Sequence, residues 1–164
     1  MYMLVSNTST LVLLAKAECL ETFIELSPVI EIPSQVKKEA LFDKDSYYAR
    51  LIEKFIKEKK IKTVHAKRAK ITEIMSQFRL DEGEAAAFAI FDSKRHNAIL
   101  TDDGELIKLC KLKNYPFICA MAVVIRLFEK KKLSREEAMN KLGDLHKIGR
   151  YSKEIYEHFK SEVK

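Results

Sequence analysis

Five side chains spread over most of the chain carry oxygen atoms that could bind a divalent cation. They are one amide and four carboxylates, namely Asn7, Glu39, Glu84, Asp102 and Asp103. Mg²⁺ and Mn²⁺ require hard oxygen ligands of this kind, and a cation satisfies carboxylates that are otherwise costly to bury together. The residue types therefore indicate a divalent metal site, provided that the fold brings them to one place.

Each of these residues also has a local explanation. Asp81 and Glu84 have the spacing of a capping box, as do Asp102 and Glu105, so these acids could serve only the free amides at a helix start. Glu39 follows two lysines, a pattern typical of a solvated helix face. The polar run after the first predicted strand could equally be an N-cap. Only their joint placement by the fold favours metal binding.

The pattern of apolar residues predicts strands that alternate with helices. Short β-branched or apolar runs predict strands at 2–6, 29–32, 61–64, 98–101 and 117–118. Helical spacing and capping signals predict helices over 11–20, 36–39, 43–60, 81–91, 103–112, the segment up to 128, and the segments after Ser134 and Ser152.

This alternation predicts an α/β fold, a three-layer α/β/α sandwich with a central parallel sheet, in which ligands gather beyond the carboxyl ends of the strands. Asn7 follows the first predicted strand, Glu39 lies one helical turn beyond the second, and Asp102 and Asp103 follow the fourth. Glu84 shares a helix face with three apolar residues, so its carboxylate points along an apolar stripe. Independent helix caps would have no reason to share one edge, so the pattern favours a common site.

Length and composition limit the classes to which the protein can belong. A chain of 164 residues suits one domain on the usual prior of roughly 100–200 residues, so we expect a single domain over 1–164 with a C-terminal helical part from about residue 134. With 47% hydrophobic and 33% charged residues, the chain is expected to fold and not to be disordered. The net charge of +6 permits a polyanionic partner.

Location is inferred from what the sequence lacks. No apolar run reaches the roughly 18 residues that span a bilayer, and the first residues carry no charged flank or cleavage site, so we expect a cytoplasmic protein that does not enter a membrane. The three cysteines form no close-spaced pair and are expected to be reduced thiols.

Four segments have an order and spacing that resemble a known family. They are Val5–Ser9 with Leu11 and Leu14, Ile32–Pro33 with Val36 and Glu39, Leu80–Ile90 around Gly83-Glu84-Ala85, and Leu100–Asp103. Together they cover nearly the whole chain and resemble the PIN-domain proteins, particularly small prokaryotic (archaeal) ones grouped with the toxins of toxin–antitoxin pairs. The sequence departs from the family at Asn7, where an aspartate is usual, and at Cys119-Ala120, where small relatives often have Gly-Thr.

The resemblance implies a PIN-like fold and a metal-dependent endoribonuclease that hydrolyses RNA phosphodiester bonds with Mg²⁺ or Mn²⁺. In this interpretation Asp102 is the main metal ligand, and Glu39 and Glu84 bind the ion directly or through water. Asp103 is a further ligand or positions water, and Asn7 supplies a neutral carbonyl oxygen. These roles make Asp102, Glu84, Glu39 and Asn7 the candidate catalytic residues.

Two hydroxyl groups are candidate substrate contacts. Ser9 and Thr101 could hydrogen-bond the metal shell or the scissile phosphate, although helix capping explains either hydroxyl as well. RNA would also need basic contacts, and the lysine-rich candidates are 57–62, 67–70 and 130–132. Tyrosines could stack on bases, although the helical spacing of Tyr47 and Tyr48 is more typical of packing.

Three functions remain open from the sequence. The first is the ribonuclease, active in the cytoplasm as a toxin that a small antitoxin protein holds, and most simply a homodimer. The second is a catalytically weakened PIN domain that binds nucleic acid. The third is a small phosphatase or other metal hydrolase on the same sheet architecture, which lacks the paired aspartates expected at the end of the first strand.

Overall fold

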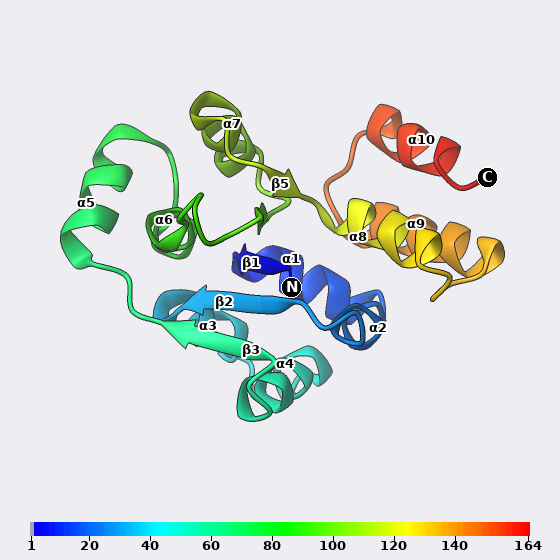
Figure 1. The fold of residues 1–164 in the computed structure, drawn as a ribbon, viewed down its shortest axis with the longest axis horizontal. Coiled ribbons are helices and arrows are strands. Elements are labelled where there is room, and N and C mark those ends of the chain that lie inside the picture. Colours follow the sequence, from blue (N-terminus) through cyan, green and yellow to red (C-terminus); the bar gives the residue numbers. More distant parts are fainter. Residues whose placement is uncertain (1) are drawn as a thin grey trace.

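Short apolar and β-branched runs form the strands of one parallel sheet. The computed structural model describes residues 2–164, and Figure 1 shows its ribbon. The strands are β1 (Met3–Ser6), β2 (Val29–Pro33), β3 (Ile61–Val64), β4 (Ala98–Leu100) and β5 (Phe117–Ile118). They lie in the order β3-β2-β1-β4-β5, and every neighbouring pair is parallel. The predicted parallel sheet is therefore confirmed.

The strand order reverses at β1. From β1 the chain passes to β2 and β3 on one side, whereas β4 pairs with the other side of β1, with Ser6 opposite Leu100. This reversal of direction is a topological switch point, where neighbouring loops diverge beyond the strand ends and leave room for a ligand. The residues that follow β1 and β4 are therefore candidates for a functional site.

Helices connect and cover the strands. They are α1 (Thr8–Lys16), α2 (Leu20–Ile24), α3 (Ser34–Ala40), α4 (Tyr47–Lys57), α5 (Arg68–Gln77), α6 (Glu82–Ile90), α7 (Gly104–Lys113), α8 (Ala120–Glu129), α9 (Arg135–Ile148) and α10 (Lys153–Ser161). The predicted helix through Leu20 is split, because Glu18 adopts a left-handed conformation (φ 57°) that ends α1 and lets α2 begin again. Helix α5 was not predicted.

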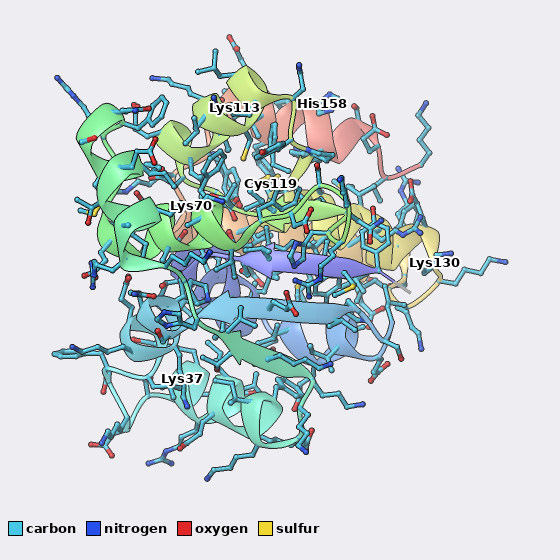
Figure 2. The ribbon with its side chains drawn as sticks, turned by 60° about the vertical axis from the view of Figure 1, so that its left-hand side comes forward. Lys37, Lys70, Lys113, Cys119, Lys130 and His158 are labelled. Carbon is cyan, nitrogen blue, oxygen red and sulfur yellow. The ribbon has the colours of Figure 1, made fainter. Side chains whose placement is uncertain are left out.

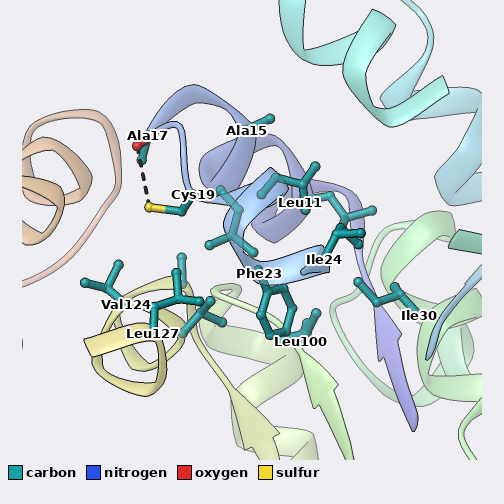
Figure 3. Packing of buried hydrophobic residues seen from close by; sticks show 14 of the residues in the cluster. Leu11, Ala15, Ala17, Cys19, Phe23, Ile24, Ile30, Leu100, Val124 and Leu127 are labelled. Atoms are coloured by element: carbon teal, nitrogen blue, oxygen red, sulfur yellow. Dashed lines mark hydrogen bonds between the residues drawn. The ribbon is translucent and has the colours of Figure 1, made fainter. Parts of the chain in front are cut away.

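Alternate residues of β1 face two different helical layers. Leu4 packs into a cluster with α1 to α4, α8 and α9, whereas Val5 packs into a second cluster with α5, α6 and α7. Figure 3 shows part of the first cluster, where the Cys19 thiol donates to the Ala17 carbonyl group at 3.5 Å. With a layer of helices on each face, the sheet forms the predicted α/β/α sandwich.

The C-terminal helices extend the first of these layers. The buried face of α9 consists of Ala138, Leu142 and Leu145, which belong to the same cluster as Leu4. No residue of α10 itself is buried, although Val163 just beyond it is. Within residues 2–164 the cysteines are free thiols, and no helix has the length and apolar character needed to cross a membrane.

Candidate metal centre

Asn7 joins the end of β1 to the start of α1. It is buried, and its side-chain Oδ1 accepts a hydrogen bond from the Thr10 backbone N–H (3.2 Å) and a longer one from the Ser9 hydroxyl (3.4 Å). Its amide nitrogen donates to Thr101 Oγ1 at 3.0 Å. The amide is therefore the N-cap of α1, and it ties the end of β1 to the end of β4.

Glu84 belongs to a capping box at the start of α6, as its spacing from Asp81 predicted. The Asp81 side chain accepts from the Glu84 backbone N–H (2.8 Å), and the Glu84 side chain accepts from the Asp81 backbone N–H (2.9 Å). The Glu84 side chain is half-buried, and its carboxyl group also lies within hydrogen-bonding range of the Asp103 carboxyl group. Capping and membership of an acidic site therefore coexist in one residue.

Glu39 reaches the same acidic group from α3. Its Oε2 accepts a hydrogen bond from the Thr8 hydroxyl (3.2 Å), and its Oε1 lies directly against the backbone of Gly83. A Cβ atom at position 83 would overlap Oε1, so only glycine allows this approach. Although much of the Glu39 residue is solvent-exposed, its carboxyl end is packed against the first turn of α6.

Asp103 is the acid of the β4 end that faces Glu84. Its carboxylate accepts from the Leu106 backbone N–H (2.8 Å) and caps α7, so the predicted pairing of Asp102 with Glu105 as a capping box is wrong. The Asp103 backbone N–H donates to Thr101 Oγ1 at 3.1 Å. Because Thr101 Oγ1 also accepts from the Asn7 amide, one buried hydroxyl group links both strand ends.

Asp102 faces away from Glu84, toward α1, α8 and the C-terminal segment. Its carboxylate accepts from the Thr10 hydroxyl (2.7 Å), from the Ala120 backbone N–H (3.2 and 3.1 Å to the two oxygens) and from the Tyr151 hydroxyl. Three donors, one of them shared between the two oxygens, thus occupy most of the roughly four acceptor positions of this carboxylate. In this arrangement Asp102 anchors three elements.

The electrostatics identify a cluster that lacks positive charge. We call Glu39, Asp81, Glu84 and Asp103 the acidic cluster. Burial raises the pKa of Glu84 from 4.5 to about 7, and the charges of Asp81 and Asp103 add to the increase. Burial and the charge of Asp81 also raise the pKa of Glu39. A cation placed among these groups would remove the repulsion and favour their ionised forms.

Asp102 and Tyr151 form a separate polar pair. Burial raises the pKa of Asp102, and the hydrogen bonds from Tyr151, Thr10 and the Ala120 backbone oppose this increase. Burial and the neighbouring Asp102 charge raise the pKa of the Tyr151 phenol above its usual range, so the phenol remains a donor. The pair is therefore a hydrogen-bonded anchor.

The acidic cluster fits an open metal site better than a closed one. In residues 2–164 no three Asp, Glu, His or Cys side chains converge closely enough to enclose an ion between them. Two adjacent carboxyl groups, Glu84 and Asp103, are nevertheless present. Mg²⁺ typically uses one or two carboxylates and fills its other positions with water and substrate phosphate oxygens, whereas structural Zn²⁺ needs a closed protein shell. The donor set fits an open, water-rich site for a hard cation.

The predicted site residues thus divide into groups. Glu39, Glu84 and Asp103 share the acidic cluster, and Asn7 is connected to Asp103 through Thr101. The structure places the two remaining predicted residues elsewhere: Asp102 lies at the Tyr151 anchor, and the exposed Ser9 has its hydroxyl directed to Asn7.

Sequence reasoning missed several residues that position these groups. Thr8, Thr10 and Tyr151 donate to the predicted carboxylates, and Gly83 provides the space for Glu39. The single available signal was Gly83, because a glycine inside the first turn of an otherwise favourable helix suggests a close approach.

Comparison with known proteins agrees with the fold. A family model described as a PIN domain matches residues 3–164, and the chain therefore belongs to the PIN-domain family. PIN domains are usually nucleases, which act on nucleic acid and generally use divalent metal ions. Neither the curated proteins nor the solved structures gave a match.

Proposed function

We propose that this PIN-domain protein is a metal-dependent endoribonuclease that hydrolyses RNA phosphodiester bonds. The observation that carries the proposal is the acidic cluster beside the β1–β4 switch point, where Glu84 has a pKa of about 7 because burial and neighbouring carboxylates disfavour its charge. Helix capping explains the hydrogen bonds of these residues but not the mutual repulsion of their charges, which a bound cation would offset.

The side chains divide the work of holding the ion. Glu84 and Asp103 would hold Mg²⁺ or Mn²⁺, and Glu39, fixed by Thr8 and Gly83, would contribute through a water molecule. When bound, the ion lowers the pKa of a water molecule and offsets charge on the phosphate. Asn7 orients Asp103 through Thr101.

The sequence assigned the central role to Asp102. In the structure, Asp102 joins the end of β4 to the start of α8. As a direct ligand it would compete with its present donors, the most exposed of which is Tyr151. Cleavage of a fluorescent RNA with Mn²⁺ distinguishes these roles. We expect Asp103→Asn and Glu84→Gln to abolish cleavage, whereas the control Glu105→Gln, an exposed acid paired with Lys108 at 3.1 Å, cleaves like the wild type.

Comparing Asp102→Asn with Asp103→Asn tests which of the two aspartates binds the ion. If Asp103→Asn cleaves normally and Asp102→Asn does not, the ion lies at Asp102 and the assignment above is wrong. If the wild type binds RNA but cleaves none with either metal ion, the nuclease proposal fails.

A second candidate, a PIN domain that binds nucleic acid without cleaving it, is favoured by one observation. The Asn7 carbonyl oxygen already accepts two hydrogen bonds at the start of α1, so it offers a cation little where relatives usually have an aspartate. The cleavage assay decides between the two candidates, because only the nuclease turns over substrate.

The biological setting is part of the proposal. We propose that the protein acts in the cytoplasm as the toxin of a toxin–antitoxin pair, as a homodimer that a small antitoxin inhibits. The absence of a membrane-spanning helix within residues 2–164 is compatible with this setting. Growth arrest on expression, relieved in the Asp103→Asn variant, would support the toxin role, and light scattering would measure the oligomeric state.

A further inference from the structure

The loop between α3 and α4 displays aromatic rings to solvent. Phe42 is 87% exposed and Tyr47 is 61% exposed, and they are the two most exposed aromatic side chains in residues 2–164. They flank a loop that follows directly after the helix carrying Glu39. Two strongly exposed rings close together in one loop form a local aromatic surface, so this loop is a candidate binding surface.

The other tyrosines with a stacking geometry are already engaged. Tyr48 is half-buried beneath Lys16, Tyr115 packs on Phe91 with ring centroids 4.6 Å apart, and Tyr151 donates to Asp102. The most exposed aromatic groups that remain available to a ligand are those of the α3–α4 loop.

Lysines surround the exposed Phe42 ring. A groove of about 490 Å³ is lined by Ser34, Lys37, Lys38, Leu41, Phe42 and Lys44. Within residues 2–164 these three lysines form no salt bridge, a property they share with other surface lysines such as Lys70 and Lys130. The groove therefore has positive charge without an internal counterion.

Acidic neighbours reduce this charge but do not cancel it. Asp43 is exposed beside Phe42, and Asp45 lies 3.9 Å from Arg50. Glu39 is directed away, toward Gly83 and Thr8. Figure 2 shows Lys37 beside the cyan helices, well separated from Lys130 on another part of the surface.

Helix α3 carries both Glu39 and three of the residues that line the groove, Ser34, Lys37 and Lys38. The Phe42 backbone N–H donates to the Glu39 carbonyl group at 3.2 Å, so the loop that carries Phe42 continues directly from the last turn of this helix.

We propose that Phe42 is a base-stacking residue for single-stranded RNA, and that Lys37, Lys38 and Lys44 contact the phosphates next to the stacked base. The identity of the nucleic acid rests on the proposed function. Aromatic rings with interleaved cations are the usual platform for unpaired nucleotides, because every base offers a π face and every phosphate a negative charge.

The charges favour RNA over a protein occupant. Lysine is depleted in the cores of protein interfaces, because its ammonium group must lose water without a matching partner. A symmetric contact between two copies of the chain would bring the same three lysines face to face. A polyanion satisfies all three charges at once.

Binding of a fluorescein-labelled poly(U) oligonucleotide, measured by anisotropy in EDTA, tests the proposal without cleavage. We expect Phe42→Ala to weaken binding roughly tenfold or more, and Phe42→Trp to restore it. The matched control is Leu112→Ala, which removes another exposed apolar side chain (67%) between two lysines on α7. Replacing Lys37, Lys38 and Lys44 with Gln should flatten the slope of log affinity against log salt by about 2, at roughly 0.7 per phosphate contact on a single strand.

The results separate this inference from the proposed nuclease. If Phe42→Ala binds poly(U) as the wild type does, or if the wild type does not bind it, the stacking role is wrong even where the protein cleaves RNA. If Phe42→Ala changes only the mass measured by light scattering, the loop is a protein interface and the inference is also wrong. If binding weakens but the wild type cleaves nothing with Mn²⁺, the stacking role stands and the nuclease proposal fails.

Discussion

The substitution Glu84→Gln should stabilise the metal-free protein at pH 8 while it impairs metal binding. Glutamine keeps an oxygen that can accept from the Asp81 backbone N–H, so the capping box survives. The substitution removes the negative charge that burial, Asp81 and Asp103 disfavour. A gain in stability together with a loss of function would identify Glu84 as a site residue and not merely a cap.

The size of the effect follows from the pKa. One pKa unit is worth about 1.4 kcal/mol, so an increase from 4.5 to about 7 corresponds to at most about 3 kcal/mol. The side chain is only half-buried, and solvent screening reduces the effect to about 1–2 kcal/mol. For a domain of this size each kcal/mol moves Tm by about 2–4 °C, so the expected increase is about 2–8 °C.

The sign of the pH dependence is fixed by the direction of the shift. Below pH 4.5 both the folded and the unfolded chain keep the Glu84 proton, and the substitution changes nothing through charge. Between pH 4.5 and about 7 the unfolded chain loses this proton while the folded chain retains it, so wild-type stability falls as pH rises. Above about pH 7 the loss is complete, and the advantage of the Glu84→Gln variant is constant.

Thermal unfolding in EDTA at pH 4 and pH 8 measures this difference. The matched control is Glu137→Gln, because Glu137 occupies the same position of the capping box on α9, and there hydrogen bonds from Ser134 lower its pKa. The control should leave Tm unchanged or lower it at pH 8. Equal gains at both pH values, or a lower Tm for Glu84→Gln at pH 8, would refute the electrostatic argument.

Three further predictions address neighbouring residues. Asn7→Asp adds a negative oxygen next to Asp103 and should tighten Mn²⁺ binding in calorimetry; unchanged affinity would exclude Asn7 from the metal site. Tyr151→Phe removes a donor to a partly buried carboxylate and should lower the free energy of unfolding by about 1.5–3 kcal/mol in urea titrations; no change would mean that this bond is negligible. RNA affinity should fall steeply with salt, because lysine contacts release counterions; an affinity indifferent to salt would argue against phosphate binding.

Features governed by neighbouring residues could be predicted from the sequence. The β3 strand at Ile61–Val64 and the capping boxes at Asp81–Glu84 and Ser134–Glu137 depend on interactions within a few residues, and all three were predicted with their observed positions. The parallel sheet followed from the alternation of strands and helices. The split between α1 and α2 could not be predicted, because the left-handed residue is Glu18 and not a glycine.

The remaining details of the site depend on pairs far apart in the sequence. Thr10 meets Asp102 across 92 residues, and Tyr151 meets it across 49. The sequence around a serine, threonine or tyrosine does not indicate which distant residue its hydroxyl group will hydrogen-bond. Two adjacent aspartates likewise gave no indication of which one would face Glu84, since that choice depends on the path of the chain after β4.

The two aspartates therefore have different physical roles despite their adjacency. After β4 the chain turns into α7, and Asp103 both caps that helix and faces Glu84, whereas Asp102 points to the opposite side and binds the start of α8. Charge repulsion opposes placing both carboxylates in one metal-free cluster, and the Ala120 N–H and the Thr10 hydroxyl give Asp102 a favourable alternative. A bound cation would change that balance, because coordination stabilises each carboxylate oxygen that reaches it. The strength of the Tyr151 hydrogen bond would then determine whether Asp102 keeps this bond or moves to the ion beside Glu84 and Asp103.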